Sequence, residues 1–182
     1  MNIRKANVYD AIDIARVHID AWRSTYRNIL SEEFLEALSF DKRKKIWLNK
    51  LENTHGIYVA ENIDGKVVGF IDGGAQRRDD YEYDGEIYAV YILDEYQNHR
   101  VGSELIYRVV KNMIGNEYKN LIIWMLDGGP ANYFYKKIGG DMKFSRVDII
   151  GGEKYKLNGY VWDDIEGLYS ILEERIKDDK IH

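Results

Sequence analysis

The sequence predicts a single domain of mixed α/β class, and three observations support this. Its 182 residues are enough for one hydrophobic core but few for two full domains. Hydrophobic residues make up 45% and charged residues 31%, which is typical of a globular protein. Segments with the helical repeat of apolar residues alternate with short segments rich in β-branched and aromatic residues, as in strands. We therefore expect residues 1–182 to form one domain.

The N-terminal third is predicted to be mainly helical after one short strand, Ile3–Ala6. Apolar residues recur at helical spacing over Ala11–Trp22, with Asp10 as the expected N-cap. A second helix is expected to begin after Ser31 and a third after Asp41, because both residue types favour the N-cap position.

After Gly56 the apolar pattern changes to a repeat of two, which indicates strands. Ile57–Glu61 and Lys66–Asp72 are predicted to form a hairpin, since Asp64-Gly65 between them is a strong turn signal. Glu86–Leu93 is a third long strand of aromatic and β-branched residues.

The remaining elements follow the same reasoning. Val101–Ile114 reads as an amphipathic helix that ends at Gly115. Leu121–Leu126 is a short apolar strand, expected to be buried on both faces. The last predicted elements are a brief helix, Ala131–Ile138, strands near Phe144–Ile150 and Lys156–Trp162 with Gly151-Gly152 between them, and a helix over Asp164–Lys177.

Composition excludes several classes of function. The chain has no cysteine, which rules out disulfides, thiolate metal sites and cysteine nucleophiles. The formal net charge of −5 argues weakly against binding to nucleic-acid phosphates, and we interpret the basic run Lys42–Lys45 as a solvated helix face. No apolar run reaches 18 residues and the N-terminus lacks a signal-peptide core, so we expect a cytoplasmic protein.

The segment Asp94–Ser103 is the most informative for chemistry, because a strand runs through a short loop directly into a helix. Amides at the start of a helix have no intrahelical acceptor and suit a phosphate. Gly102 would let a ligand approach the backbone, and His99 and Arg100 add donors. The alternative is an ordinary strand-to-helix turn. No Walker or dinucleotide glycine pattern is present.

Several segments, spaced along nearly the whole chain, resemble the GNAT N-acetyltransferases. Glu86–Ser103 (EIYAVYILDEYQNHRVGS) is similar to the acetyl-CoA-binding motif, a strand leading into Gln/Arg-x-x-Gly-x-Gly/Ala. Ala131–Gly140 (ANYFYKKIGG) resembles the family segment Ala-x-x-Phe-Tyr-Glu-Lys-Leu-Gly. Ala21–Ile29 and Gly159–Trp162 resemble a bacterial subgroup. The likeness implies a mixed, mostly antiparallel central sheet flanked by helices.

Two positions depart from the family pattern. Arg100 stands where the first motif glycine is usual, and Gly128 stands where an asparagine is usual. These departures bear on coenzyme affinity more than on the chemistry. They keep open an alternative function, a catalytically weak module or sensor that binds acyl-CoA.

The resemblance implies direct acetyl transfer from acetyl-CoA to a primary amine in a ternary complex, without a metal. Tyr135 matches the tyrosine that protonates the leaving sulfur, and Glu86 lies where one branch of the family carries its general base. Packing is the alternative for Tyr135, and a strand end or a salt bridge for Glu86. The residues expected to bind the coenzyme are Tyr91, Ile92, Leu93, Gln97, Asn98, His99, Arg100, Val101, Gly102, Ser103 and Asn132, the last of which could instead serve the helix start.

The acceptor is not identified by the sequence. Trp22 and Tyr26 lie one helical turn apart and could line an acceptor pocket or belong to the core. Five acids between Asp79 and Glu86 could attract a protonated amine or form a solvated loop. His18, His55 and His182 lack metal-ligand spacing. Polyamine, aminoglycoside, amino acid, peptide and protein lysine all stay open, and the late strands make a homodimer plausible.

Overall fold

The computed structural model describes residues 1–53, 56–78 and 80–177, so His55, Asp79 and His182 lie outside the described residues. Backbone contacts divide the chain into two compact units. The first contains residues 1–72 and 89–109, and the second contains residues 73–88 and 110–182. Two strands and one helix run from one unit into the other. The single domain over 1–182 stays a prediction.

The α-helices and strands follow one another along the chain in the predicted order. The strands are β1 (Asn2–Lys5), β2 (Ile57–Glu61), β3 (Val67–Ala75), β4 (Gly85–Ile92), β5 (Leu121–Leu126), β6 (Asp141–Ile150) and β7 (Glu153–Trp162). The helices are α1 (Ala11–Thr25), α2 (Glu32–Glu36), α3 (Phe40–Asn53), α4 (Val101–Gly115), α5 (Asn132–Lys137) and α6 (Ile165–Lys177), with short 3-10 turns at Val8–Asp10 and Asp94–Tyr96.

The seven strands form one sheet in the order β1-β2-β3-β4-β5-β7-β6. The β1–β2, β2–β3, β5–β7 and β7–β6 pairs are antiparallel, whereas β4 and β5 are parallel. The expected fold class, a mixed and mostly antiparallel sheet with flanking helices, is confirmed.

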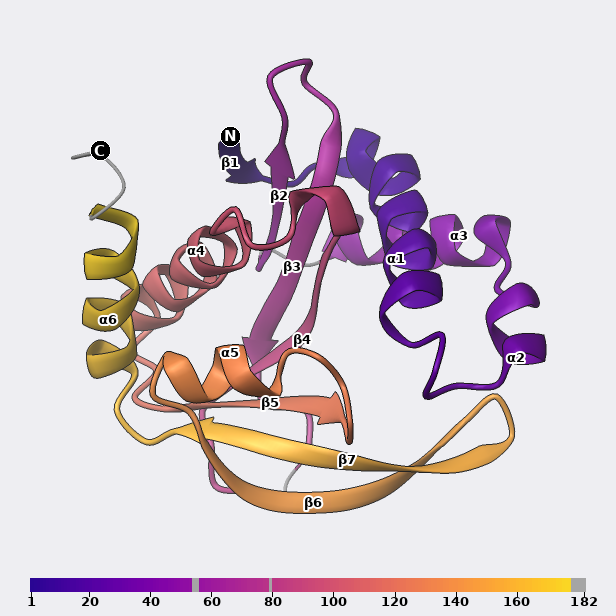
Figure 1. Cartoon of the computed structure of the whole chain (residues 1–182). Coiled ribbons are helices and arrows are strands. Elements are labelled where there is room, and N and C mark those ends of the chain that lie inside the picture. The colour runs from indigo at the N-terminus through magenta and orange to yellow at the C-terminus, as the bar shows by residue number, and fades with distance from the viewer. Residues whose placement is uncertain (54–55, 79, 178–182) are drawn as a thin grey trace. The chain divides into compact units, whose positions relative to one another are not determined.

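In the first unit, α1 and α3 pack beside the β2–β3 hairpin (Figure 1). The hairpin turns at Gly65, whose φ of +76° lies in the left-handed region that glycine adopts without steric cost. Gly69 in β3 allows close approach of the end of β4, since a Cβ there would lie 3.1 Å from Ile92 Cγ1. The buried cluster includes Ile14, Val17, Trp47, Val59 and Phe70.

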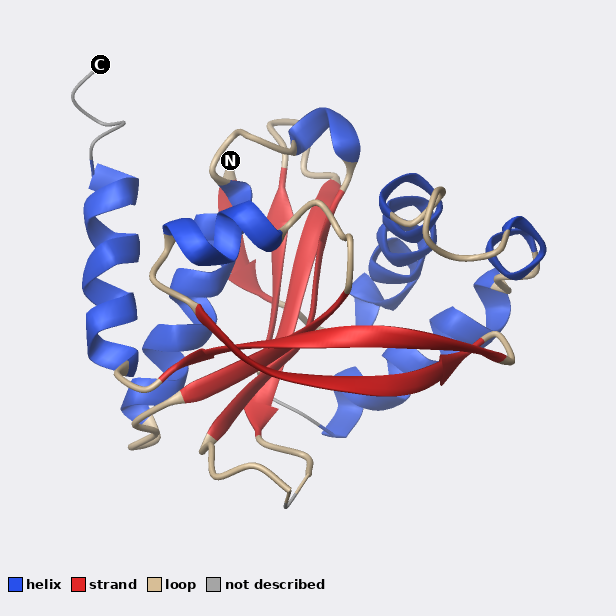
Figure 2. Ribbon diagram, turned by 60° about the horizontal axis from the view of Figure 1, so that its bottom comes forward, coloured by secondary structure: helices blue, strands red, loops and turns tan. Residues whose placement is uncertain are grey.

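In the second unit, β6 and β7 form a long twisted hairpin that reverses at Gly151-Gly152, both with positive φ (Figure 2). Each strand has ten residues, three more than the seven predicted for each. Their additional residues are mostly polar, and a polar sequence gives no apolar alternation to mark a strand. Helix α6 buries Ile165, Leu168 and Leu172.

Two of the predicted helix starts differ in detail. The side chain of Asp10 makes no cap bond to α1; it pairs with Arg4 and accepts a bond from the Asn7 amide at 2.8 Å. Helix α3 begins one residue before Asp41, because Ser39 Oγ accepts from the amide of residue 42 at 3.3 Å.

Of the helices in the described ranges, none combines the length and the apolar character that a membrane crossing requires.

Candidate functional site

The loop between β4 and α4 is held in place by its own side chains. Gln97 donates from Nε2 to the carbonyl oxygen of Ile92 at 3.2 Å and to Asp94 Oδ1 at 2.9 Å. Asp94 Oδ1 also accepts from Ser24 Oγ at the end of α1, at 2.8 Å. The motif glutamine Gln97 is thus hydrogen-bonded within the protein, and it holds the β4–α4 loop in place.

Asn98 and Arg100 both adopt the left-handed backbone conformation, with φ of 62° and 61°. This conformation costs an ordinary L-residue about 1–2 kcal/mol, whereas glycine reaches it freely. The position of Arg100 therefore has the backbone of a glycine, which accounts for the glycine of the family motif there. The chain keeps this conformation with an arginine, so a permanent positive charge stands at the loop.

Helix α4 begins directly after Arg100. Its first backbone bond runs from the Glu104 amide to the Arg100 carbonyl at 3.1 Å, so helix geometry leaves the amides of residues 101–103 without an intrahelical acceptor. Val101 and Ser103 are buried, Gly102 is partly exposed, and Asn98 and His99 are exposed. Three amides, a left-handed loop and the Arg100 guanidinium together fit a diphosphate.

The aromatic residues predicted to line the acceptor site lie on the same unit as this loop. The rings of Trp22 and Tyr26 are 5.5 Å apart and edge-on, and both lie near Tyr91 of β4, at 6.2 and 6.4 Å. Burial raises the pKa of Tyr26, although a hydrogen bond with Tyr91 opposes the shift. The structure therefore brings a predicted coenzyme-strand residue into contact with both predicted substrate residues.

His18 completes this aromatic group, and the sequence interpretation gave it no role. Its ring lies 5.0 Å from Tyr91 and 5.5 Å from Trp22, and its Nδ1 accepts from Trp47 Nε1 at 3.2 Å. Burial, followed by the charges of Arg43 and Lys50, lowers the pKa of His18 to about 3. His18 is therefore neutral, with its proton on Nε2. The signal for it was the spacing of four between residues 18, 22 and 26.

Tyr135, the candidate acid, belongs to the second unit and is 4% exposed. Its ring packs against Tyr160 at 5.6 Å and Trp162 at 6.2 Å, both on β7. Asn132, one turn earlier, accepts from the Tyr160 hydroxyl at 2.6 Å and donates to the Gly129 carbonyl at 2.9 Å. Asn132 thus links the start of α5 to β7 and to the preceding turn, and its contact with the coenzyme stays a prediction.

Glu86, the candidate base, is 2% exposed and is bound by Arg77. The Arg77 amide and Nε each donate to Glu86 Oε2 at 3.1 Å, and a guanidinium NH2 donates to Oε1. The same guanidinium lies 4.2 Å from the ring centroid of Tyr88. Glu86 therefore forms a salt bridge with Arg77, and its role as general base stays a prediction. Accepting a proton would require one of these bonds to open.

Several acids of the preceding loop also have partners. Asp84 accepts from the Lys119 amide at 2.7 Å, and Asp80 lies 3.8 Å from Arg78. Asp79 lies outside the described residues. Asp80 and Asp84 therefore stabilise the loop through these contacts, in addition to giving it negative charge.

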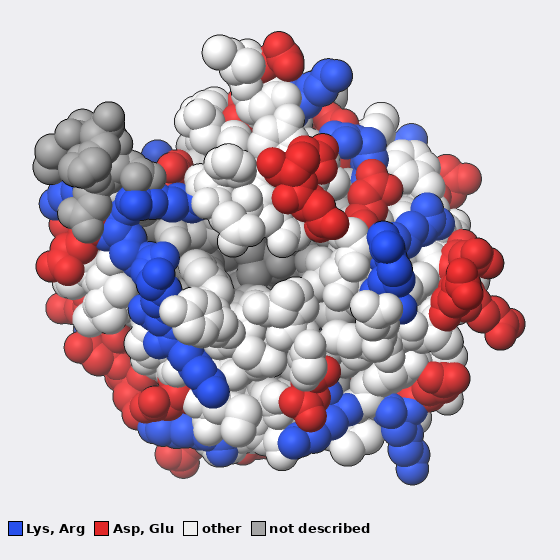
Figure 3. All heavy atoms as spheres, viewed as in Figure 1, with Lys and Arg blue, Asp and Glu red and all other residues white. Residues whose placement is uncertain are grey.

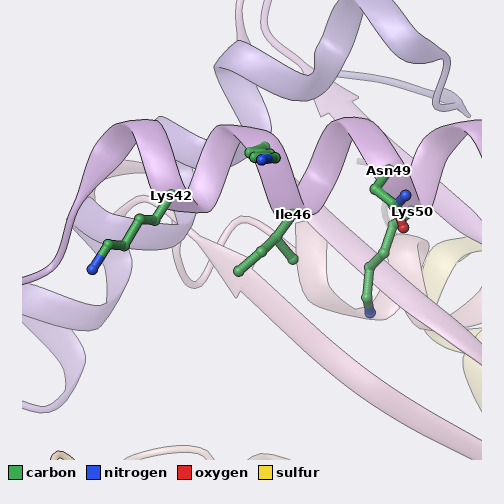
Figure 4. A pocket seen from close by; sticks show the side chains of 5 residues that line it. Lys42, Ile46, Asn49 and Lys50 are labelled. Atoms are coloured by element: carbon green, nitrogen blue, oxygen red, sulfur yellow. The ribbon is translucent and has the colours of Figure 1, made fainter.

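A surface depression on α3 is a separate feature of the first unit. It is lined by Lys42, Lys45, Ile46, Asn49 and Lys50, and Figure 4 shows the labelled side chains projecting from the helix. It contains none of the predicted site residues, and Lys50 pairs with Asp72. Figure 3 shows acidic and basic groups distributed over the face viewed. Within the described ranges, no group of three or more His, Asp or Glu side chains is arranged to hold a metal.

Comparison with known proteins places these features in context. A family model described as the acetyltransferase (GNAT) family matches residues 19–140. The N-acetyltransferase YuaI of Bacillus subtilis is 30% identical over 172 residues, which cover 94% of this chain and 98% of that protein. A spermidine N(1)-acetyltransferase of Thermoplasma acidophilum is 23% identical over 180 residues, covering 96% and 97% of the two chains.

Solved structures agree with the fold. The PaiA N-acetyltransferase of T. acidophilum in complex with coenzyme A has a TM-score of 0.66 at 21% identity, with 86% of this chain and 96% of that chain covered. A ribosomal-protein-alanine N-acetyltransferase of Brucella melitensis has a TM-score of 0.67 at 20% identity, covering 89% and 99%. The family match, which spans the β4–α4 loop and α5, agrees with the motifs and the sheet topology. The chain belongs to the acetyltransferase (GNAT) family and is an N-acetyltransferase.

Proposed function

We propose that this enzyme moves an acetyl group from acetyl-CoA to a primary amine by direct attack within a ternary complex. The β4–α4 loop carries the proposal, because it combines amides that lack intrahelical acceptors with a positive charge at Arg100. Direct attack is the simplest route, since a chain without cysteine cannot form an acyl-cysteine.

The first unit would bind the co-substrate. The amides of residues 101–103 and the Arg100 guanidinium would hold the diphosphate, and the backbone of Tyr91–Leu93 would pair with the pantetheine arm. Acetyl-CoA supplies an activated acetyl thioester when it is bound. An amide near Ile92 would polarise the thioester carbonyl, which favours attack by a neutral amine.

Tyr135 would donate the proton that the departing thiolate needs. A phenol is an adequate acid for this purpose, because free phenols and thiols have pKa values of about 10 and 8.5. The amine must also lose a proton, and either Glu86 or a water chain would accept it. Glu86 can take this role only if its bonds to Arg77 rearrange.

The test measures thiol release from acetyl-CoA across a panel of amines for the parent enzyme and two variants. Tyr135→Phe should lower kcat by about 10²–10⁴-fold, the range for one general acid, with unchanged affinity for CoA. Tyr133→Phe is the matched control, because Tyr133 lies on the same helix but is 75% exposed. Equal rates in both variants would remove Tyr135 from the mechanism. Tight CoA binding without turnover on any amine would instead favour an acyl-CoA-binding module.

Self-association of two chains through β6 is also part of this proposal. Strand β6 is the last strand of the sheet, and its side chains Val147 and Ile149 are 63% and 70% exposed. A two-fold axis at Val147 would place Arg146 of each chain opposite Asp148 of the other, with the valines in contact. Shifting the pairing by two residues in either direction would place Arg146 opposite Arg146 or Asp148 opposite Asp148, and like charges that face each other across two strands are destabilising.

Light scattering at several concentrations tests this pairing. The parent should have the mass of a dimer and Val147→Lys that of a monomer. Ile63→Lys, at a fully exposed position in the β2–β3 turn, should stay dimeric. A monomeric parent, or a dimer that survives Val147→Lys, would contradict the β6 interface.

A further inference from the structure

Arg43 of α3 differs from the other arginines near the aromatic group. Arg23 donates to the Leu35 carbonyl at 3.1 Å, and Arg16 donates to the Val67 carbonyl at 2.8 Å. Arg43 is likewise only partly exposed, yet its guanidinium makes no ion pair or hydrogen bond within residues 1–53, 56–78 and 80–177. Its guanidinium carbon lies 5.8 Å from the ring centroid of Trp22.

Two further donors in the same group also lack an acceptor in the described part of the chain. Nε1 of Trp22 and Nε2 of His18 are both buried and without a hydrogen-bond partner. His18 is itself 6% exposed, and its ring centroid lies 5.5 Å from that of Trp22. A buried N–H without an acceptor is costly, so most native proteins supply one.

All three groups share one chemical character, because each can only donate a hydrogen bond or carry positive charge. Burial lowers the pKa of Arg43, although the charge of an ionised Tyr91 would oppose this shift, and no carboxylate pairs with the guanidinium within residues 1–53, 56–78 and 80–177. Arg43 and Lys50 also disfavour a proton on His18. This environment repels a second cation and favours an anion with several acceptor lone pairs.

We propose that the acceptor is a small amine that also bears a carboxylate, and that Arg43 binds this carboxylate. Trp22 Nε1 donates a further hydrogen bond to this carboxylate, and His18 Nε2 is a third hydrogen-bond donor in the same aromatic group. The inference rests on the proposed function, in which Trp22 and Tyr26 line the acceptor site. A carboxylate suits the planar fork of a guanidinium and brings its own lone pairs to the orphan donors. A polyamine such as spermidine offers neither.

The experiment compares amines in matched pairs that differ only by the carboxylate. L-Phenylalanine is paired with phenethylamine and L-methionine with 3-(methylthio)propylamine, and spermidine is included as the polycation. The parent enzyme should show a kcat/KM at least about tenfold higher for the carboxylated member of its preferred pair, equivalent to about 1.4 kcal/mol.

Variants then assign the preference to a residue. Arg43→Gln should bring the ratio within a pair close to one, and Arg43→Lys should keep part of the preference because it keeps the charge. Lys45→Met removes a lysine that is two residues away on α3 and exposed, and it should leave the ratio unchanged.

The parent ratio decides the proposal even if Arg43→Gln folds poorly. Preference for the decarboxylated amine or for spermidine would overturn the proposal while leaving N-acetyl transfer intact. A ratio that survives Arg43→Gln in a folded variant would also overturn it. Absence of transfer to every amine would remove this proposal and the proposed function together.

Discussion

Replacing His18 by glutamine should make the stability of this protein less sensitive to mild acid. The native pKa of His18 is about 3, against an ordinary value of 6.5, because the ring is buried and lies near two positive charges. Above pH 6.5 both the native and the unfolded states hold neutral histidine, so the group contributes no pH dependence. Below pH 6.5 the unfolded state takes up a proton that the native state excludes, and the free energy of unfolding falls.

The slope of this effect is about 1.4 kcal/mol per pH unit between pH 6.5 and 3. At pH 5 the parent should therefore have lost about 2 kcal/mol relative to pH 7 through this residue alone. Urea unfolding at pH 7, 6 and 5 measures it, with the parent, His18→Gln and His99→Gln compared. His99 is an exposed histidine on the β4–α4 loop and serves as the control, so the His99→Gln variant should lose as much stability between pH 7 and pH 5 as the parent.

Glutamine at position 18 keeps an acceptor for Trp47 Nε1, which limits the loss of stability at pH 7. The quantity compared among the three proteins is the change in the free energy of unfolding between pH 7 and pH 5, not its value at one pH. If His18→Gln loses as much stability as the parent over this range, His18 is accessible to protons in the native state. The buried aromatic group would then be wrongly described.

Two further predictions concern the β4–α4 loop and the start of α4. Gly102→Glu should weaken CoA binding by at least tenfold in calorimetry, because it adds negative charge beside the proposed diphosphate site. Gly115→Glu, at the other end of α4, is the control and should bind CoA as the parent does. Equal affinities of the two variants for CoA would contradict the proposed diphosphate site. Arg100→Gly should raise the free energy of unfolding by about 0.5–1 kcal/mol, the left-handed strain less the chain entropy of glycine. Arg108→Gly, in the interior of α4, is the control and should lower the free energy of unfolding by about 1 kcal/mol. A lower free energy of unfolding in both variants would show that position 100 is not strained.

The sequence predicted most of the fold because the fold is largely encoded in local patterns. Asp64-Gly65 and Gly151-Gly152 fall where the two hairpins reverse. The apolar repeat, together with cap and turn residues, located the α-helices and strands of the described residues to within a few residues. The first three residues of β6 and of β7 were not predicted, because most of them are polar and give no apolar alternation.

The chemistry of the candidate site was less predictable, since it depends on partners that no local pattern reveals. The pairing of Arg77 with Glu86 across the β3–β4 turn has no signature in either segment. The bond between Asn132 and Tyr160 joins residues 28 positions apart. The family motif indicated the loop, but only the backbone shows that Arg100 has the conformation of a glycine.

The central claim is acetyl transfer from acetyl-CoA to an amine nitrogen, and mass spectrometry of the reaction mixture tests it most directly. The parent enzyme is incubated with acetyl-CoA and the amine panel, and N-acetylated amine and free CoA are quantified together. We expect one acetylated amine for each CoA released, both slowed in Tyr135→Phe and unaffected in Tyr133→Phe. CoA release without any acetylated amine, or binding of acetyl-CoA with no product at all, would contradict the account.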